Sequence, residues 1–209
     1  MGEGAVSRRL ALWLLEQPGT GTTITLCLDG NQIAHFETEH FANRHIDNED
    51  RTWRFTEALR KKGQKARWPG VWQDSARRKI VVTSTVTPKT AKWTTCDLEA
   101  STQHGKIRVE CKGANDRTAR IHLQEAIGQV VTIRDVQDNE VLAVALPYSP
   151  RLQDLAEEFL NAPIFGSLNI VIALVHHHDH VEWWRWNGQI AECVSLTELW
   201  PTKKADLKL

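Results

Sequence analysis

The chain has 209 residues and a mass of 23.8 kDa, which is long enough for one well-buried core. Its hydrophobic fraction of 41% and charged fraction of 25% are those of an ordinary soluble globular protein. Its 26 basic and 26 acidic residues cancel, which excludes a strongly basic field as the basis of nucleic-acid binding. Any such contact must come from local patches.

The cysteines and the N-terminus point to an intracellular protein. Cys27, Cys96, Cys111 and Cys193 show no CxxC spacing, so we interpret them as reduced, buried thiols. The apolar run LALWLL ends at Glu16 and is too short for a secretory signal. No segment reaches the roughly 20 apolar residues of a membrane-spanning helix. We expect a cytoplasmic protein with no membrane partner.

The first fifty residues predict a helix and a hairpin. Residues 7–17 are expected to form a short helix with Ser7 as its N-cap. Strand-like runs at 22–28 and 31–37 flank Asp29-Gly30, a strong signal for a hairpin turn. We expect residues 1–50 to be an N-terminal extension of the core.

The next segments alternate between helical and strand-like patterns. Trp53–Lys62 has acidic residues before it and a basic end followed by glycine, which predicts a helix. Strands are expected at 79–86, 93–100, 106–112, 141–146 and 168–175, and helices at about 117–132 (capped by Asn115 or Asp116) and 150–160. The last two strands are apolar without alternation, which indicates burial on both faces of the sheet. This order predicts an α/β fold with a central mixed sheet flanked by helices.

The chain end predicts a second hairpin. Strand-like runs at 181–186 and 189–196 flank Asn187-Gly188, the strongest short hairpin signal. We expect a core at 51–178, followed by this hairpin and a tail at 179–209.

Asp97, Glu110 and Lys112 are the candidate active-site residues. If 93–100 and 106–112 pair as an antiparallel hairpin, facing residues have numbers that sum to about 206 or 207. With the second value, Asp97 faces Glu110, and Lys112 lies on the same face two residues on. Facing carboxylates repel unless a cation compensates, and hard oxygen ligands suit Mg²⁺ or Mn²⁺. With Lys112 to hold or deprotonate a water, these are the parts needed to hydrolyse a phosphodiester.

This pattern resembles the PD-(D/E)XK nuclease superfamily, which includes restriction endonucleases and Holliday-junction resolvases. The matching motifs are Cys-Asp97-Leu-Glu-Ala and, thirteen positions on, Val-Glu110-Cys-Lys112-Gly. The resemblance covers about residues 52–175 and implies a restriction endonuclease-like core in which the carbonyl of Cys111 helps to bind the metal. Cys96 stands where the family usually has proline, and Ile133 stands where a frequent subtype has tyrosine.

The resemblance also implies two supporting catalytic residues. Many members carry a glutamine on the helix after the motif, a place that Gln129 occupies, with Gly128 beside it to allow close packing. His122 and Glu125 share the helical face of Gln129. Many members also carry a glutamate on the helix before the first core strand, which Glu57 matches in position.

Basic residues give candidate nucleic-acid contacts. Arg117 and Arg120, at the start of the helix after the motif, are expected near the scissile phosphate, and Lys61 and Lys62 belong to the densest basic run. The expected partner is DNA, with RNA not excluded, and a homodimer is plausible because many relatives cut both strands as dimers.

We therefore expect a Mg²⁺-dependent endonuclease acting on DNA in repair, defence or mobile-element processing. The alternative is a catalytically inert module that keeps the nuclease fold and binds nucleic acid or a partner protein. A third hypothesis is a metalloprotein built around the histidine-rich run 176–180, which could ligate zinc. Because consecutive residues point in alternate directions, they cannot all converge on one ion, and we interpret the run as an exposed strand end.

Overall fold

The computed structural model describes residues 1–28, 54–55, 70–73, 79–84, 96–133, 136–178 and 180–200. Its strands are β1 (Thr20–Leu28), β2 (Arg54–Phe55), β3 (Gly70–Gln73), β4 (Lys79–Ser84), β5 (Leu98–Thr102), β6 (Lys106–Cys111), β7 (Glu140–Pro147), β8 (Ile170–Val175), β9 (Val181–Trp186) and β10 (Ala191–Val194). Its helices are α1 (Glu3–Glu16), α3 (Ala119–Val130), α4 (Pro150–Leu160), α5 (Pro163–Leu168) and the 3₁₀ helix η2 (Leu196–Leu199).

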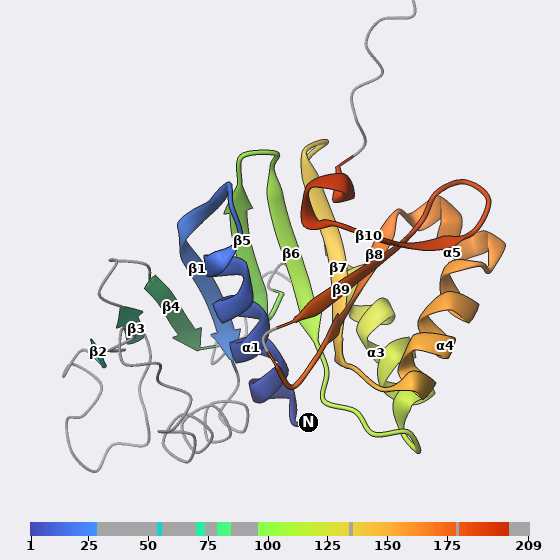
Figure 1. Ribbon diagram of the computed structural model, residues 1–209, viewed down its shortest axis with the longest axis horizontal. Coiled ribbons are helices and arrows are strands. Elements are labelled where there is room, and N and C mark those ends of the chain that lie inside the picture. Colours follow the sequence, from blue (N-terminus) through green and yellow to red (C-terminus); the bar gives the residue numbers. More distant parts are fainter. Residues whose placement is uncertain are drawn as a thin grey trace, which may run out of the picture.

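The described strands form one mixed sheet in the order β10-β9-β8-β7-β6-β5-β1-β4-β3-β2 (Figure 1). Strands β6, β7 and β8 run parallel to one another, and so do β1 and β4, whereas the other neighbouring pairs are antiparallel. The predicted α/β fold with a central mixed sheet flanked by helices is confirmed.

Helices cover both faces of the sheet, so β7 and β8 are buried on both sides. On one face, Leu10 and Leu14 of α1 pack with inward-facing residues such as Ile24 and Val109. On the other face, α3 and α4 pack against alternate residues such as Ile172. All six residues of β8 are buried, which explains why its sequence lacks polar alternation.

Helix α1 begins earlier than the sequence pattern predicts. Its first residue is Glu3 and its N-cap is Gly2, so the prediction of Ser7 as the cap is wrong. The buried Ser7 hydroxyl instead donates to the carbonyl of Glu3, 3.1 Å away and four residues back. This bond satisfies the Ser7 hydroxyl inside the helix, so the side chain does not cap a helix end.

Strand β1 lies between β5 and β4 rather than in the predicted Asp29-Gly30 hairpin. It pairs antiparallel with β5 and parallel with β4, so both of its edges are occupied. The proposed partner strand, 31–37, lies outside the described residues. The long-range parallel pairing with β4 therefore overrides the local turn signal at β1.

The prediction of a helix over Trp53–Lys62 is wrong at the start of that segment, because Arg54–Phe55 forms β2 and pairs with β3. The rest of that segment, including Glu57, Lys61 and Lys62, lies outside the described residues. Thr118 occupies the N-cap position of α3 but its side chain makes no capping hydrogen bond. Oδ1 of Asn115, one of the two predicted caps, accepts from the backbone N–H groups of Arg117 and Thr118 in the turn that leads into the helix. Helix α5, which was not predicted, ends at Asn169 in the left-handed region with φ of 49°.

The two ends of the chain contribute to the same sheet and core. The predicted C-terminal hairpin is confirmed, since β9 and β10 pair with Trp186 opposite Ala191. Trp183 of β9 is buried beside Trp13 of α1, with ring centroids 6.1 Å apart. None of the four cysteines forms a disulfide, but Cys27 is half-buried and Cys193 is exposed, so the expectation that all four are buried is wrong for these two.

Candidate metal centre

The predicted pairing of Asp97 with Glu110 follows from the register of β5 and β6. Leu98 faces Val109 and Glu99 faces Arg108. The same register, extended by one residue, places Asp97 opposite Glu110, as the hairpin arithmetic predicts. Leu98 and Val109 point into the core under α1, so Asp97 and Glu110 point to the opposite, α3 face.

Asp97 is held in place by the strands on either side of it. The backbone N–H of Cys111 donates to its carboxylate Oδ2 over 2.8 Å. Its own carbonyl accepts from the backbone N–H of Cys27 in β1 over 2.7 Å. Because Asp97 is only 7% exposed, these bonds fix the direction of a carboxylate that has little room to move.

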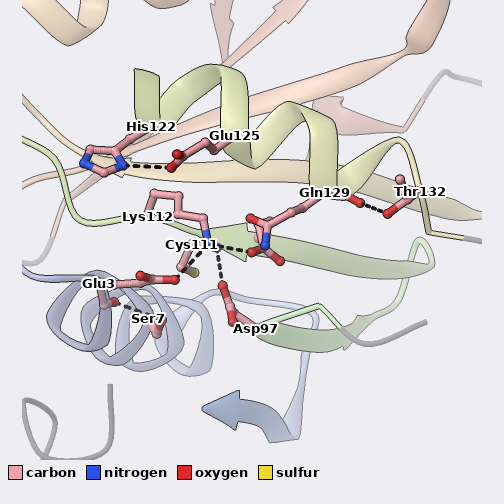
Figure 2. A network of polar contacts seen from close by, with 10 residues as sticks. Glu3, Ser7, Asp97, Cys111, Lys112, His122, Glu125, Gln129 and Thr132 are labelled. Carbon is pink, nitrogen blue, oxygen red and sulfur yellow. Dashed lines mark hydrogen bonds and ion pairs between the residues drawn. The ribbon is translucent and has the colours of Figure 1, made fainter. Parts of the chain in front are cut away.

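Lys112 bridges two carboxylates at the end of β6. Its Nζ donates to Oε1 of Glu110 over 2.9 Å and to Oε1 of Glu3 over 3.0 Å (Figure 2). Its backbone N–H donates to the carbonyl of Ala145 over 2.9 Å and so continues the β6–β7 ladder. The lysine is therefore anchored by its backbone and directed by its ammonium group.

Glu3 is a member of this site that sequence reasoning missed. It comes from the first turn of α1, and Gly113 allows that turn to approach, because a Cβ on Gly113 would lie 2.6 Å from the backbone nitrogen of Glu3. Carboxylate oxygens of Glu3, Asp97 and Glu110 all lie within 4.8 Å of one another. Glu3 lies 94 positions before Asp97, so no local sequence pattern links the two residues. The one feature that could have indicated a close backbone approach is Gly113, next to Lys112.

Burial dominates the electrostatics of this group. Burial, and then the charge of Glu110, raises the pKa of Asp97 well above its usual value. Burial likewise raises the pKa of Glu110, although the ammonium of Lys112 opposes this shift. Burial lowers the pKa of Lys112, but its hydrogen bond and charge interaction with Glu110 outweigh that effect and raise it. Three carboxylates thus share one ammonium, and the group favours an added proton or cation.

The donor set fits a hard divalent cation. Glu3, Asp97 and Glu110 offer only carboxylate oxygens, the ligands that Mg²⁺ and Mn²⁺ prefer. Burial raises the pKa of the Cys111 thiol well above its usual value, and the thiol faces the core under α1. Its side chain is therefore a poor ligand, and a metal-binding role of Cys111 through its carbonyl stays a prediction.

The residues of α3 that we expected near this group differ in what they contact, whereas Glu57 lies outside the described residues. Gln129 is exposed on α3, the helix above the group in Figure 2. His122 and Glu125 pair with each other over 3.1 Å. A Cβ on Gly128 would meet nothing within 4 Å, so the expectation that this glycine permits close packing against the sheet is wrong.

The two arginines near the start of α3 differ in their contacts with the rest of the protein. Arg117 is exposed, whereas Nη2 of Arg120 donates to both carboxylate oxygens of Glu158 at 2.7 Å. Arg120 also lies over the ring of Phe159, 5.5 Å from its centroid. Arg120 is thus engaged with α4, while Arg117 is the better placed of the two for an external anion.

Comparison with known protein families, curated proteins and solved structures finds no match to this chain. Within the described residues, no helix combines the length and the apolar character needed to cross a membrane.

Proposed function

We propose that this chain is a Mg²⁺-dependent nuclease of the PD-(D/E)XK type, which hydrolyses phosphodiester bonds of DNA as an endonuclease. The observation that carries the proposal is the juxtaposition of Asp97, Glu110 and Lys112. The two carboxylates face each other across β5 and β6, and the ammonium lies 2.9 Å from Glu110. Acids on an ordinary solvated sheet face remain exposed to water. Burial of two facing acids is typical of a site in which a cation compensates their charge.

Each residue of the group has a role in the proposed reaction. Asp97 and Glu110, joined by Glu3 and the Cys111 carbonyl, hold Mg²⁺ or Mn²⁺. The bound cation supplies Lewis acidity and neutralises charge on the phosphate. Lys112 positions the attacking water, and its own backbone is fixed to β7 by a hydrogen bond. Gln129 on α3 supports the substrate side of the site, and Glu57 is a further supporting residue in this proposal.

Cleavage of plasmid DNA with Mg²⁺ or Mn²⁺ tests the proposal. We expect wild-type protein to nick or linearise the plasmid, and Glu110→Gln and Lys112→Met to lose at least about a hundredfold in rate. Glu99→Gln is the matched control, because Glu99 lies on the same face of β5 but pairs with Arg108 at 3.5 Å. Equal cleavage by wild type, Glu110→Gln and Lys112→Met would contradict the proposal.

The second candidate is an inert nuclease-fold module that binds nucleic acid or a partner protein. It is favoured by the zero formal net charge of the chain and by the ion pair between Lys112 and Glu3, which occupies the lysine. Calorimetric titration with Mn²⁺ separates the two functions. DNA retention without Mn²⁺ binding or cleavage would favour the inert module, whereas Mn²⁺ binding that Glu110→Gln abolishes favours the nuclease.

A further inference from the structure

A second group of potential metal ligands lies at the turn between β8 and β9. The strand register pairs Val175 with Val181, and one residue further it places His176 opposite His180. The backbone N–H of His176 donates to the carbonyl of His180 over 2.9 Å, which closes the turn. Because alternate residues of a strand share a face, His180 and Glu182 project on the same side as His176.

The three side chains converge on one point. Nε2 of His176 lies 2.9 Å from Oε1 of Glu182, and the rings of His176 and His180 have centroids 4.9 Å apart. One ligand atom from each residue lies within 4.8 Å of the others. Ligands of a tetrahedral Zn²⁺ at about 2.0–2.1 Å from the ion are roughly 3.3 Å apart, so small side-chain rotations bring all three into coordination range.

Neighbouring aromatic residues fix the orientation of two of the ligands. The indole N–H of Trp184 donates to Oε2 of Glu182 over 3.1 Å, which leaves Oε1 directed at His176. The ring of Tyr148 stacks on that of His176 with centroids 3.8 Å apart and planes 17° from parallel. A hydrogen-bonding partner such as Trp184 sets the direction of a carboxylate ligand and raises metal affinity, and the stacked Tyr148 ring restricts rotation of the His176 ring.

The geometry points to a Zn²⁺ site formed by His176, His180 and Glu182. Two imidazoles and one carboxylate suit a borderline ion such as Zn²⁺, whereas the all-oxygen group at Asp97 suits Mg²⁺. Three protein ligands leave a fourth position open to water or an added ligand. The site is independent of the proposed nuclease activity and goes beyond it.

The site lies at the same edge of the sheet as the Asp97 group. Strands β6, β7 and β8 are parallel, so Lys112, Tyr148 and His176, which follow them, come together at one edge. Two strand spacings of about 4.8 Å separate β6 from β8, or roughly 10 Å. An ion at each group would give this edge two separate cation sites of different chemistry.

Calorimetric titration of the metal-stripped full chain with Zn²⁺ tests the inference, in the Glu110→Gln background so that the carboxylate group contributes little. We expect about one equivalent to bind, and His180→Ala and Glu182→Gln each to weaken binding by at least about a hundredfold. Trp184→Phe should weaken it by roughly tenfold to a hundredfold, the effect of losing an orienting partner. Co²⁺ substitution supplies a second readout, because histidine ligation gives a visible absorption band.

His178→Ala is the matched control. His178 is exposed in the same turn but is not one of the three ligands, so its loss should leave Zn²⁺ affinity unchanged. His180 is also exposed, so His180→Ala is expected to fold, which circular dichroism verifies. Zn²⁺ binding that is absent in the parent protein, or equal in His180→Ala, Glu182→Gln and His178→Ala, would overturn the site.

Discussion

The backbone N–H of Cys111 donates a 2.8 Å hydrogen bond to Oδ2 of Asp97, so the carboxylate is aligned by the same strand that carries Glu110. Because the donor belongs to the main chain, this alignment does not depend on the Cys111 thiol. An asparagine at position 97 offers an acceptor oxygen to the same donor but carries no charge. Asp97→Asn therefore separates the electrostatic role of the residue from its structural role.

Without divalent cations, the buried acids should make stability fall as the pH rises. Burial raises the pKa values of both Asp97 and Glu110, so the folded state binds more protons than the unfolded chain above about pH 4. The stability that this pair contributes is therefore fully present below about pH 4 and is lost as the pH rises through the raised pKa values. In EDTA, we expect the Tm to fall over this range, and to fall less steeply in Asp97→Asn.

Thermal unfolding followed by circular dichroism at a series of pH values measures this effect. Other titrating groups are common to both proteins, so the difference between wild type and Asp97→Asn isolates the buried pair. Adding Mn²⁺ at neutral pH should raise the Tm of wild type more than that of Asp97→Asn. Parallel pH curves for the two proteins would contradict the role assigned to burial.

Glu3 is expected to contribute to metal binding although it lies far from Asp97 in sequence. Glu3→Gln removes one of the three carboxylates that lie within 4.8 Å of one another, so Mn²⁺ affinity should fall by roughly tenfold to a hundredfold. Calorimetry measures the affinity, and circular dichroism verifies that the helix persists. Glu16→Gln, at the other end of α1, is the control and should bind Mn²⁺ like wild type. Unchanged affinity in Glu3→Gln would remove Glu3 from the site.

Gly113 and Gly128 should respond in opposite ways to alanine. A Cβ on Gly113 would lie 2.6 Å from the backbone nitrogen of Glu3, so Gly113→Ala should displace the start of α1 and cost about 1–3 kcal/mol of stability. Gly128 lies inside α3 with nothing within 4 Å of its Cβ position, so Gly128→Ala should add about 0.5–1 kcal/mol. Urea unfolding measures both changes.

Gly113→Ala should also weaken Mn²⁺ binding, because it moves Glu3, while Gly128→Ala should leave that affinity unchanged. A Gly113→Ala protein with wild-type stability and wild-type Mn²⁺ affinity would show that the approach of α1 does not position the site.

The two arginines near α3 should differ in their contribution to DNA binding. Arg117 is exposed, so Arg117→Ala should weaken binding and reduce the slope of log affinity against log salt by about 0.9, the value for one phosphate contact. Arg120 is engaged by Glu158 and Phe159, so Arg120→Ala should change the slope little. Fluorescence anisotropy with labelled duplex DNA at several salt concentrations measures both. An equal loss of slope in the two variants would contradict this distinction.

The sequence by itself determined the paired strands β5 and β6, the buried strands β7 and β8, and the centre of the site. Apolar runs without alternation predict the doubly buried strands β7 and β8, and the short loop between β5 and β6 leaves only two registers, one of which faces Asp97 with Glu110. These features depend on local period and loop length, which are properties of neighbouring residues. Glu99 opposite Arg108 follows from the same register and is observed.

Only the tertiary structure decided which distant residues join these local features. The parallel pairing of β1 with β4 occupies the edge that a local Asp-Gly hairpin would use, and α1 brings Glu3 to Lys112 across Gly113. Such contacts depend on the packing of whole elements, whose free energy comes from burial over the entire core and leaves no pattern in any short stretch of sequence.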